Sequence, residues 1–101
     1  MPNRDMQTRG LRVLVIDDED AMREVLGLRL SQWGYRVSRA ESAVQGWEQM
    51  NRLQPDIVIC AVVMPDQSGL ELVKRASEEE IEAAFIMITA HGTVDIAVEA
   101  M

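Results

Sequence analysis

Four short apolar runs, separated by segments of helical periodicity, constrain this chain more than any other feature. Three of the runs are rich in Val and Ile and nearly continuous in apolarity, which is typical of strands covered on both faces. The shorter run alternates with Arg36 and Ser38, which indicates an edge strand. The runs are Leu11–Ile16, Tyr35–Val37, Ile57–Val63 and Phe85–Thr89.

Apolar residues at helical spacing predict one helix after each run. Gly34 stands directly after the first of these segments, where a left-handed C-terminal cap is expected. Ser42 and Ser68 each open a capping-box pattern ahead of the second and third segments. The expected buried stripes are Met22, Val25, Leu26, Leu30 and Trp33; Val44, Trp47 and Met50; Leu70, Val73 and Ala76; and Val94, Ala97, Val98 and Met101.

The repeated strand-helix order predicts an α/β fold, a parallel sheet with right-handed crossovers and helices on both faces. In such sheets function gathers at the carboxyl ends of the strands. That edge is expected to hold Asp17–Glu19, Ala61–Gly69 and Thr89–Thr93.

Asp17 and Asp18 directly follow the first strand, and two adjacent carboxylates repel each other unless a cation or hydrogen bonds stabilise them. A hard divalent cation such as Mg²⁺ suits such a pair because it takes oxygen ligands and keeps several waters. The alternative is structural, since acidic residues also stabilise the amino end of a following helix through its dipole. Both interpretations remain open on these residues alone.

Other polar residues near the strand ends have two readings as well. The Thr89 hydroxyl could bond a phosphoryl oxygen, but a β-branched residue also simply suits a strand. Pro65 and Gly69 indicate a sharp loop that could present backbone carbonyls to a metal. Cys60 is expected to be an inert core residue, and His91 an exposed loop residue with no partner to orient it.

Composition excludes several classes of function. The 101 residues allow one domain, and 10 Lys+Arg against 17 Asp+Glu give a net charge of −7. This charge argues against direct nucleic-acid contact. The longest apolar run, Ile57–Met64, is too short for a membrane span, and the N-terminus lacks a signal-peptide core. One cysteine excludes an intramolecular disulfide, which fits a cytoplasmic location.

Three motifs together carry a resemblance to a known family. They are VLVIDDED, PDIVICAVVMPDQSGLEL and IMITAHGTVDIAVEAM. From about Leu11 to Met101 the chain resembles a receiver domain of bacterial two-component response regulators. The last motif most resembles receivers that precede AAA+ enhancer-binding (NtrC-like) transcription activators. The resemblance implies a flavodoxin-like, doubly wound sheet in the order 2-1-3-4-5. We expect 2-1-3-4 here, with residues 1–10 as an N-terminal extension and 11–101 as a receiver that lacks its fifth βα unit.

The resemblance also implies a phosphorelay function, because family members transfer a phosphoryl group from a histidine kinase onto their own aspartate. The domain would then control its own effector, here an AAA+ and DNA-binding region. Asp17 and Asp18 match the acidic pair that binds Mg²⁺, and the Val63 backbone carbonyl falls where the metal site is completed. Thr89 matches the hydroxyl that contacts the phosphoryl oxygens.

Two departures from the family pattern affect the chemistry. The phosphoacceptor aspartate should stand four residues before Pro65, where this chain has Ala61, and the family lysine would lie beyond Met101. An alanine methyl has no lone pair to attack phosphorus, so we expect a receiver that cannot accept phosphate, is not an enzyme and binds Mg²⁺ weakly. Asp66 lies beyond the turn and is not expected to substitute. The otherwise intact pattern favours a recent or engineered Asp-to-Ala change.

Two other functions are compatible with parts of the sequence. Ala61 and the apolar segment Val94–Met101 suggest a phosphorylation-independent dimerisation or docking module on a receiver fold. A metal-dependent α/β hydrolase would need a base or nucleophile that the strand ends do not supply. Without a fifth strand the Phe85–Thr89 run would be an open apolar edge, which predicts a homodimer, a strand-exchanged oligomer or poor solubility.

Overall fold

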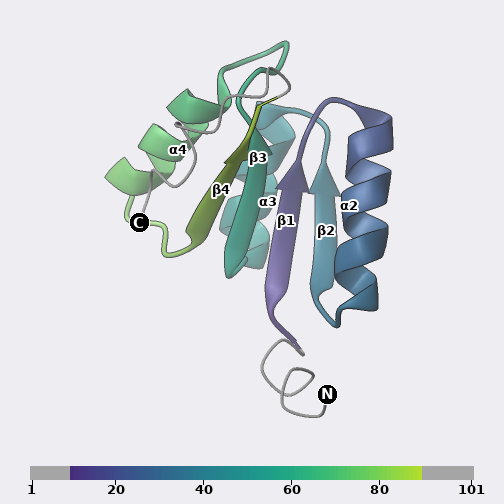
Figure 1. The fold of residues 1–101 in the computed structure, drawn as a ribbon. Helices are drawn as coiled ribbons and strands as arrows, with labels where there is room; N and C mark the ends of the chain where they lie inside the picture. The colour runs from purple at the N-terminus through teal and green to yellow at the C-terminus, as the bar shows by residue number, and fades with distance from the viewer. Residues whose placement is uncertain (1–9, 90–101) are drawn as a thin grey trace.

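The computed structural model describes residues 10–89, which form a parallel sheet with helices on both faces. The strand order is β2-β1-β3-β4, as the sequence predicted (Figure 1). The elements are β1 (Arg12–Ile16), α2 (Asp20–Gln32), β2 (Arg36–Ala40), α3 (Ala43–Leu53), β3 (Ile57–Ala61), α4 (Gly69–Glu78) and β4 (Ala84–Ile88).

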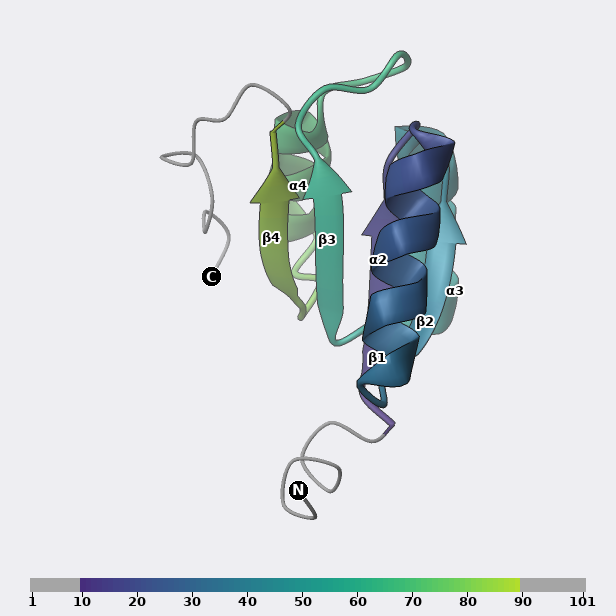
Figure 2. The same cartoon turned by 45° about the vertical axis from the view of Figure 1, so that its right-hand side comes forward.

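Helices cover both faces of this sheet, which explains why β3 is apolar throughout and β1 is apolar after Arg12. Helix α2 lies on one face, and α3 and α4 lie on the other (Figures 1 and 2). Because successive strand residues point to opposite faces, β1 contributes to two apolar clusters. Leu14 and Ile16 pack in the larger cluster with residues of α3 and α4. Val13 and Val15 pack in the smaller one, under α2.

The parallel register aligns the carboxyl ends of the strands along one edge of the sheet. Ile16 pairs with Ala40 and with Cys60, and Ala61 pairs with Ile88. Strand β3 ends two residues earlier than the apolar run predicted, at Ala61 instead of Val63. The shorter run gives an edge strand, as expected, but β2 extends further, to Ala40.

The predicted helix caps are present. Gly34 has φ of 100° and follows α2. Its N–H donates to the Ser31 carbonyl at 3.0 Å, and the Tyr35 N–H donates to the Leu30 carbonyl at 3.1 Å, the two bonds of a Schellman cap. The Ser42 hydroxyl accepts from the Gln45 N–H at 3.2 Å at the start of α3. The Ser68 hydroxyl accepts from the Leu70 N–H at 3.1 Å at the start of α4.

The predicted buried stripes of the helices are correct only in part. Four residues predicted to be buried are exposed instead: Val25 by 63%, Trp33 by 45%, Val44 by 67% and Leu70 by 38%. In α2 the residues that face the sheet are centred on Gly27, which is buried beneath the Arg39 side chain of β2. The fourth apolar stripe and His91 lie outside the described residues. Between residues 10 and 89, no helix has both the length and the apolarity needed to cross a membrane.

Candidate functional site

The residues predicted to form the site line a single hollow at the carboxyl edge of the sheet. It has a volume of about 290 Å³. The parallel topology brings together residues that lie up to 72 positions apart (89 − 17) in the sequence. Its lining consists of Asp17, Asp18, Glu19, Met22, Ala61, Val63, Ile88 and Thr89. We refer to it below as the acidic hollow.

Asp17 is held firmly at the end of β1. Only 6% of its surface is exposed, and it is the one charged residue buried in the described part of the chain. Its N–H donates to the Ala40 carbonyl at 3.1 Å, and its Oδ1 accepts from the Glu19 N–H at 3.0 Å. Its carbonyl oxygen accepts from Arg23 Nη1 at 2.7 Å. The neighbouring Asp18 is exposed, so the pair joins a fixed carboxylate to a solvent-facing one.

Ala61 ends β3 in the wall of the acidic hollow, where it offers only a methyl group. It is 7% exposed and pairs with Ile88 of β4. Val63 lines the same hollow and is 67% exposed. The loop that follows β3 is tight, since the Gly69 N–H donates to the Val62 carbonyl at 2.7 Å.

The charge of the acidic hollow favours a cation. Its charged lining residues are all carboxylates, at positions 17–19. Within residues 10–89 no group of three or more His, Cys, Asp or Glu side chains is arranged to hold a metal ion. Mg²⁺ binds through one or two carboxylates and several waters, so the buried Asp17 with Asp18 fits a partial Mg²⁺ site.

Cys60 lies next to the acidic hollow but is not suited to act as a nucleophile. It is fully buried, and its Sγ lies 3.4 Å from the Ala61 carbonyl oxygen. Burial, and secondly the charge of Asp17, raise the pKa of the Cys60 thiol to about 12. The thiolate is therefore scarce at neutral pH, as expected for an inert core cysteine.

Asp66 does not line the acidic hollow. Its two carboxylate oxygens accept from the Ala43 and Val44 N–H groups of α3, at 3.1 and 3.0 Å. These bonds, first that of Ala43, lower the pKa of the Asp66 carboxyl group. Sequence reasoning missed this role. The Ser42 cap marks a helix start, where the first N–H groups have no partner within the helix, but no local signal points to Asp66 as their acceptor.

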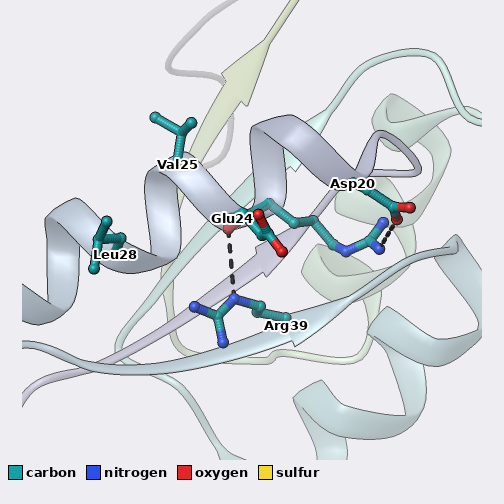
Figure 3. Close-up of a pocket in the computed structure, with 6 residues that line it drawn as sticks. Asp20, Glu24, Val25, Leu28 and Arg39 are labelled. Atoms are coloured by element: carbon teal, nitrogen blue, oxygen red, sulfur yellow. Dashed lines mark hydrogen bonds and ion pairs between the residues drawn. The ribbon is translucent and has the colours of Figure 1, made fainter.

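A larger hollow of about 610 Å³ lies beside α2 and β2, and sequence reasoning did not predict it. Figure 3 shows Arg39 reaching from β2 towards α2, with Val25 on the opposite side of the helix. Arg39 Nε donates to the Arg23 carbonyl at 3.4 Å, while Arg23 forms an ion pair with Asp20. Val25 and Leu28 add exposed apolar surface. The Asp20–Arg23 ion pair and the bond from Arg39 to the Arg23 carbonyl connect α2 internally and to β2, so we assign these groups a structural role.

Fold and site together define a receiver. Residues 13–101 match the response regulator receiver domain family. The chain belongs to this family.

Several transcriptional regulators contain similar sequences. The chain is 34% identical over 95 residues to the transcriptional regulatory protein GlrR of Escherichia coli, covering 94% of this chain and 21% of that protein. It is 41% identical over 92 residues to FixJ of Azorhizobium caulinodans, covering 91% of this chain and 44% of that protein. It thus spans less than half the length of these relatives.

Solved structures agree with the fold. The FixJ-N crystal structure has a TM-score of 0.78 and 32% identity, covering 93% of this chain and 75% of that one. The response regulator TrrA of Thermotoga maritima, in complex with Mg²⁺ and BeF, has a TM-score of 0.76 and 32% identity, covering 85% of this chain and 76% of that one. The predicted flavodoxin-like architecture is confirmed.

Proposed function

We propose that this chain is the signal-input domain of a transcription-controlling response regulator, in a form that cannot accept a phosphoryl group at the family's usual position. One observation carries the proposal: Ala61 lies in the same acidic hollow as Asp17, Asp18 and Thr89. The hollow thus has the acidic pair and the hydroxyl that the family resemblance implies, but no carboxylate where the acceptor is expected.

Without a carboxylate at position 61 the site has no nucleophile, although the fold is that of a receiver. Phosphoryl transfer depends on an attacking oxygen positioned in line with the leaving group and on stabilisation of charge. The Ala61 methyl cannot attack phosphorus, and both oxygens of Asp66 are engaged at the start of α3. On this proposal the chain catalyses no phosphorylation of its own.

Asp17, Asp18 and the Val63 carbonyl are the groups that would hold Mg²⁺, and the family resemblance implies that the Thr89 hydroxyl would contact a phosphoryl oxygen. Bound Mg²⁺ would neutralise negative charge in the hollow. The Mg²⁺ complex of TrrA supports this assignment by similarity. Because Ala61 supplies no ligand, the affinity of this chain for Mg²⁺ should be low.

We further propose that the whole protein takes its signal from a histidine kinase and passes it to its own AAA+ and DNA-binding effector region in the cytoplasm. The similarity to GlrR and to ZraR, which the chain covers by 21% and 22%, supports a long regulator of this kind. FixJ, covered by 44%, represents a shorter alternative. The acidic receiver itself would make no direct contact with nucleic acid.

The test compares the full-length protein with its Ala61→Asp variant. Both are incubated with acetyl phosphate and Mg²⁺ and weighed intact. Ala61→Asp should gain one phosphoryl mass, while the parent and an Ala61→Asn control should gain none. Failure of Ala61→Asp would contradict the proposal. Phosphorylation of the parent that disappears in Asp66→Ala would instead identify Asp66 as an acceptor.

A docking module that works without phosphorylation is the second candidate. Ala61 favours it, together with the exposed apolar side chains of Val25 and Leu28 on α2. On this view the protein forms a constitutive dimer that neither Ala61→Asp nor Mg²⁺ alters. Sedimentation velocity of the full-length protein tests this, and a strictly monomeric protein would exclude it.

A further inference from the structure

A second charged hollow lies at the opposite end of the sheet from the acidic hollow. It has a volume of about 360 Å³, and three arginines line it. Arg12 is the first residue of β1, Arg36 is the first residue of β2, and Arg52 lies in the last turn of α3. Figure 1 shows these amino-terminal strand ends far from the strand tips that border the acidic hollow. We call this cluster the arginine hollow.

The fold itself gathers these three side chains. Arg12 and Arg36 are register partners in the parallel pair β1–β2, so their side chains share one face of the sheet. Leu14 and Ile16 point to the same face of β1 as Arg12, and they pack in the cluster that contains Met50 of α3. That face is therefore the one covered by α3. Arg12 Nη1 donates to the Leu53 carbonyl at 2.9 Å, which joins the strand to the end of α3.

The charged side chains that line this hollow are all arginines. No carboxylate lines it, although the chain as a whole carries a net charge of −7. The ion pairs found among residues 10–89 involve Arg23 and Arg75, and neither Arg36 nor Arg52 has a side-chain hydrogen bond there. Asp56 does not line the hollow, but it is bonded to Arg12 at two points. Its Oδ2 accepts from the Arg12 N–H at 2.8 Å, and its own N–H donates to the Arg12 carbonyl at 2.9 Å.

Stabilisation of the helix end explains part of the cluster. Cations near the last turn of a helix interact favourably with its dipole, which accounts for Arg52 and for the bond from Arg12 to Leu53. Arg36 is not part of α3, and no bond to a described residue holds its side chain. Arg36 is exposed and lines one hollow with Arg12 and Arg52, so an anion bound there would interact favourably with all three positive charges.

The lining indicates which anion would fit. Guanidinium groups present paired N–H donors that match phosphate oxygens. Val37, Leu53 and Pro55 add apolar wall to the same hollow, suited to an organic portion. We propose that the arginine hollow binds a multiply charged phosphate anion, either a free pyrophosphate-like group or the phosphate tail of a nucleotide. The site is independent of Ala61 and of the function proposed above.

The test measures binding of pyrophosphate and of ATP by calorimetry, in EDTA and at constant ionic strength. The parent protein should bind with saturation at one site. Arg36→Gln and Arg52→Gln should each weaken binding by about tenfold or more, since each removes a charge-assisted contact. Lys74→Gln is the matched control, because it makes the same change in net charge on the exposed surface of α4.

Amide chemical shifts locate the bound anion and separate its two sources. Equal affinity for pyrophosphate and ATP would assign the site to the phosphate group alone, and tighter ATP binding would add contacts to the apolar wall. Either result supports the proposal. It would be overturned by the absence of saturable binding, by an equal loss in Lys74→Gln, or by tighter binding of an oligonucleotide, which would indicate a nucleic-acid surface instead.

Discussion

Gly69 begins α4 directly behind the end of β3, so the two backbones lie close together. A Cβ atom at this position would lie 1.9 Å from the Ala61 carbonyl oxygen. Gly69→Ala should therefore lower the free energy of unfolding by about 3 kcal/mol, the upper part of the usual range for overpacking. Urea denaturation followed by circular dichroism measures the loss.

Gly46→Ala is the matched control. Its Cβ would meet the Ile16 Cδ1 atom at 2.6 Å, and this atom ends a flexible side chain. Its cost should be about 1 kcal/mol, because the side chain can shift. Equal losses in the two variants would show that the close approach at Ala61 is not what requires glycine.

The Asp66 carboxylate connects its loop to α3, and its titration should be visible in stability. The N–H of Ala43 and then that of Val44 hold the pKa of Asp66 below its ordinary value. The stabilisation is therefore complete above the ordinary pKa of about 3.9, and it is lost as the pH falls through the lower folded value. Asp66→Asn should have a lower urea midpoint than the parent at pH 7, and the difference should shrink in acid.

Glu48→Gln, an exposed substitution on α3 with the same change in charge, is the control for this series. It should track the parent across the whole pH range. A deficit in Asp66→Asn that persists unchanged at low pH would mean that packing, and not the carboxylate, is responsible.

At the scale of elements, features that depend on neighbouring residues could be predicted from the sequence, and features that depend on tertiary contacts could not. The caps at Gly34 and Ser42 were predictable because each depends on a few neighbouring residues. The exposure of Val25 and Val44 was not, because apolar spacing does not say which stripe a sheet will cover. The two bonds of Asp66 to α3 span 23 and 22 positions, and no local pattern encodes them.

The candidate site was more predictable than the helix faces. Asp17 and Asp18 follow one apolar run and Thr89 ends another, and parallel topology alone brings such positions to one edge. Their meeting in the acidic hollow was therefore expected. The hydrogen bond from Arg23 to the Asp17 carbonyl was not expected, because it depends on the direction in which α2 runs from the end of β1.

The cap of α3 gives a prediction at this scale. Ser42→Ala should lower the free energy of unfolding by about 1 kcal/mol, because the Gln45 N–H loses its acceptor. Ser42→Gly should lower the free energy of unfolding by only about 0.3 kcal/mol. Thermal and urea unfolding measure both. Ser31→Ala, within α2, should be neutral or slightly stabilising, and a similar loss there would argue against the cap.

At the scale of the whole molecule, the excess of acidic residues makes stability depend on ions. With a net charge of −7, raising NaCl at neutral pH should raise Tm, because screening weakens self-repulsion. MgCl₂ at the same ionic strength should raise it further if the acidic hollow binds the cation. At a free Mg²⁺ concentration of ten times Kd, binding should raise the free energy of unfolding by about 1.4 kcal/mol.

Differential scanning calorimetry of Asp17→Asn separates screening from binding. An asparagine keeps an oxygen that can accept from the Glu19 N–H but removes the buried charge. The additional Tm increase in MgCl₂ should disappear in this variant, while the NaCl effect remains. The Ala61→Asp variant should show a larger Mg²⁺ effect than the parent. Identical responses in all three proteins would exclude a specific site.

The reactivity of the single cysteine can report how often the sheet opens. Cys60 is fully buried in the central strand β3, and its thiol has a pKa of about 12. Alkylating reagents act on an exposed thiolate, so they will modify the chain only when β3 separates from its neighbours. The rate of modification therefore reports how often the sheet opens, without any engineered label. The effect of a ligand, of salt or of a substitution on this opening can be measured as a change in the rate at which Cys60 is alkylated.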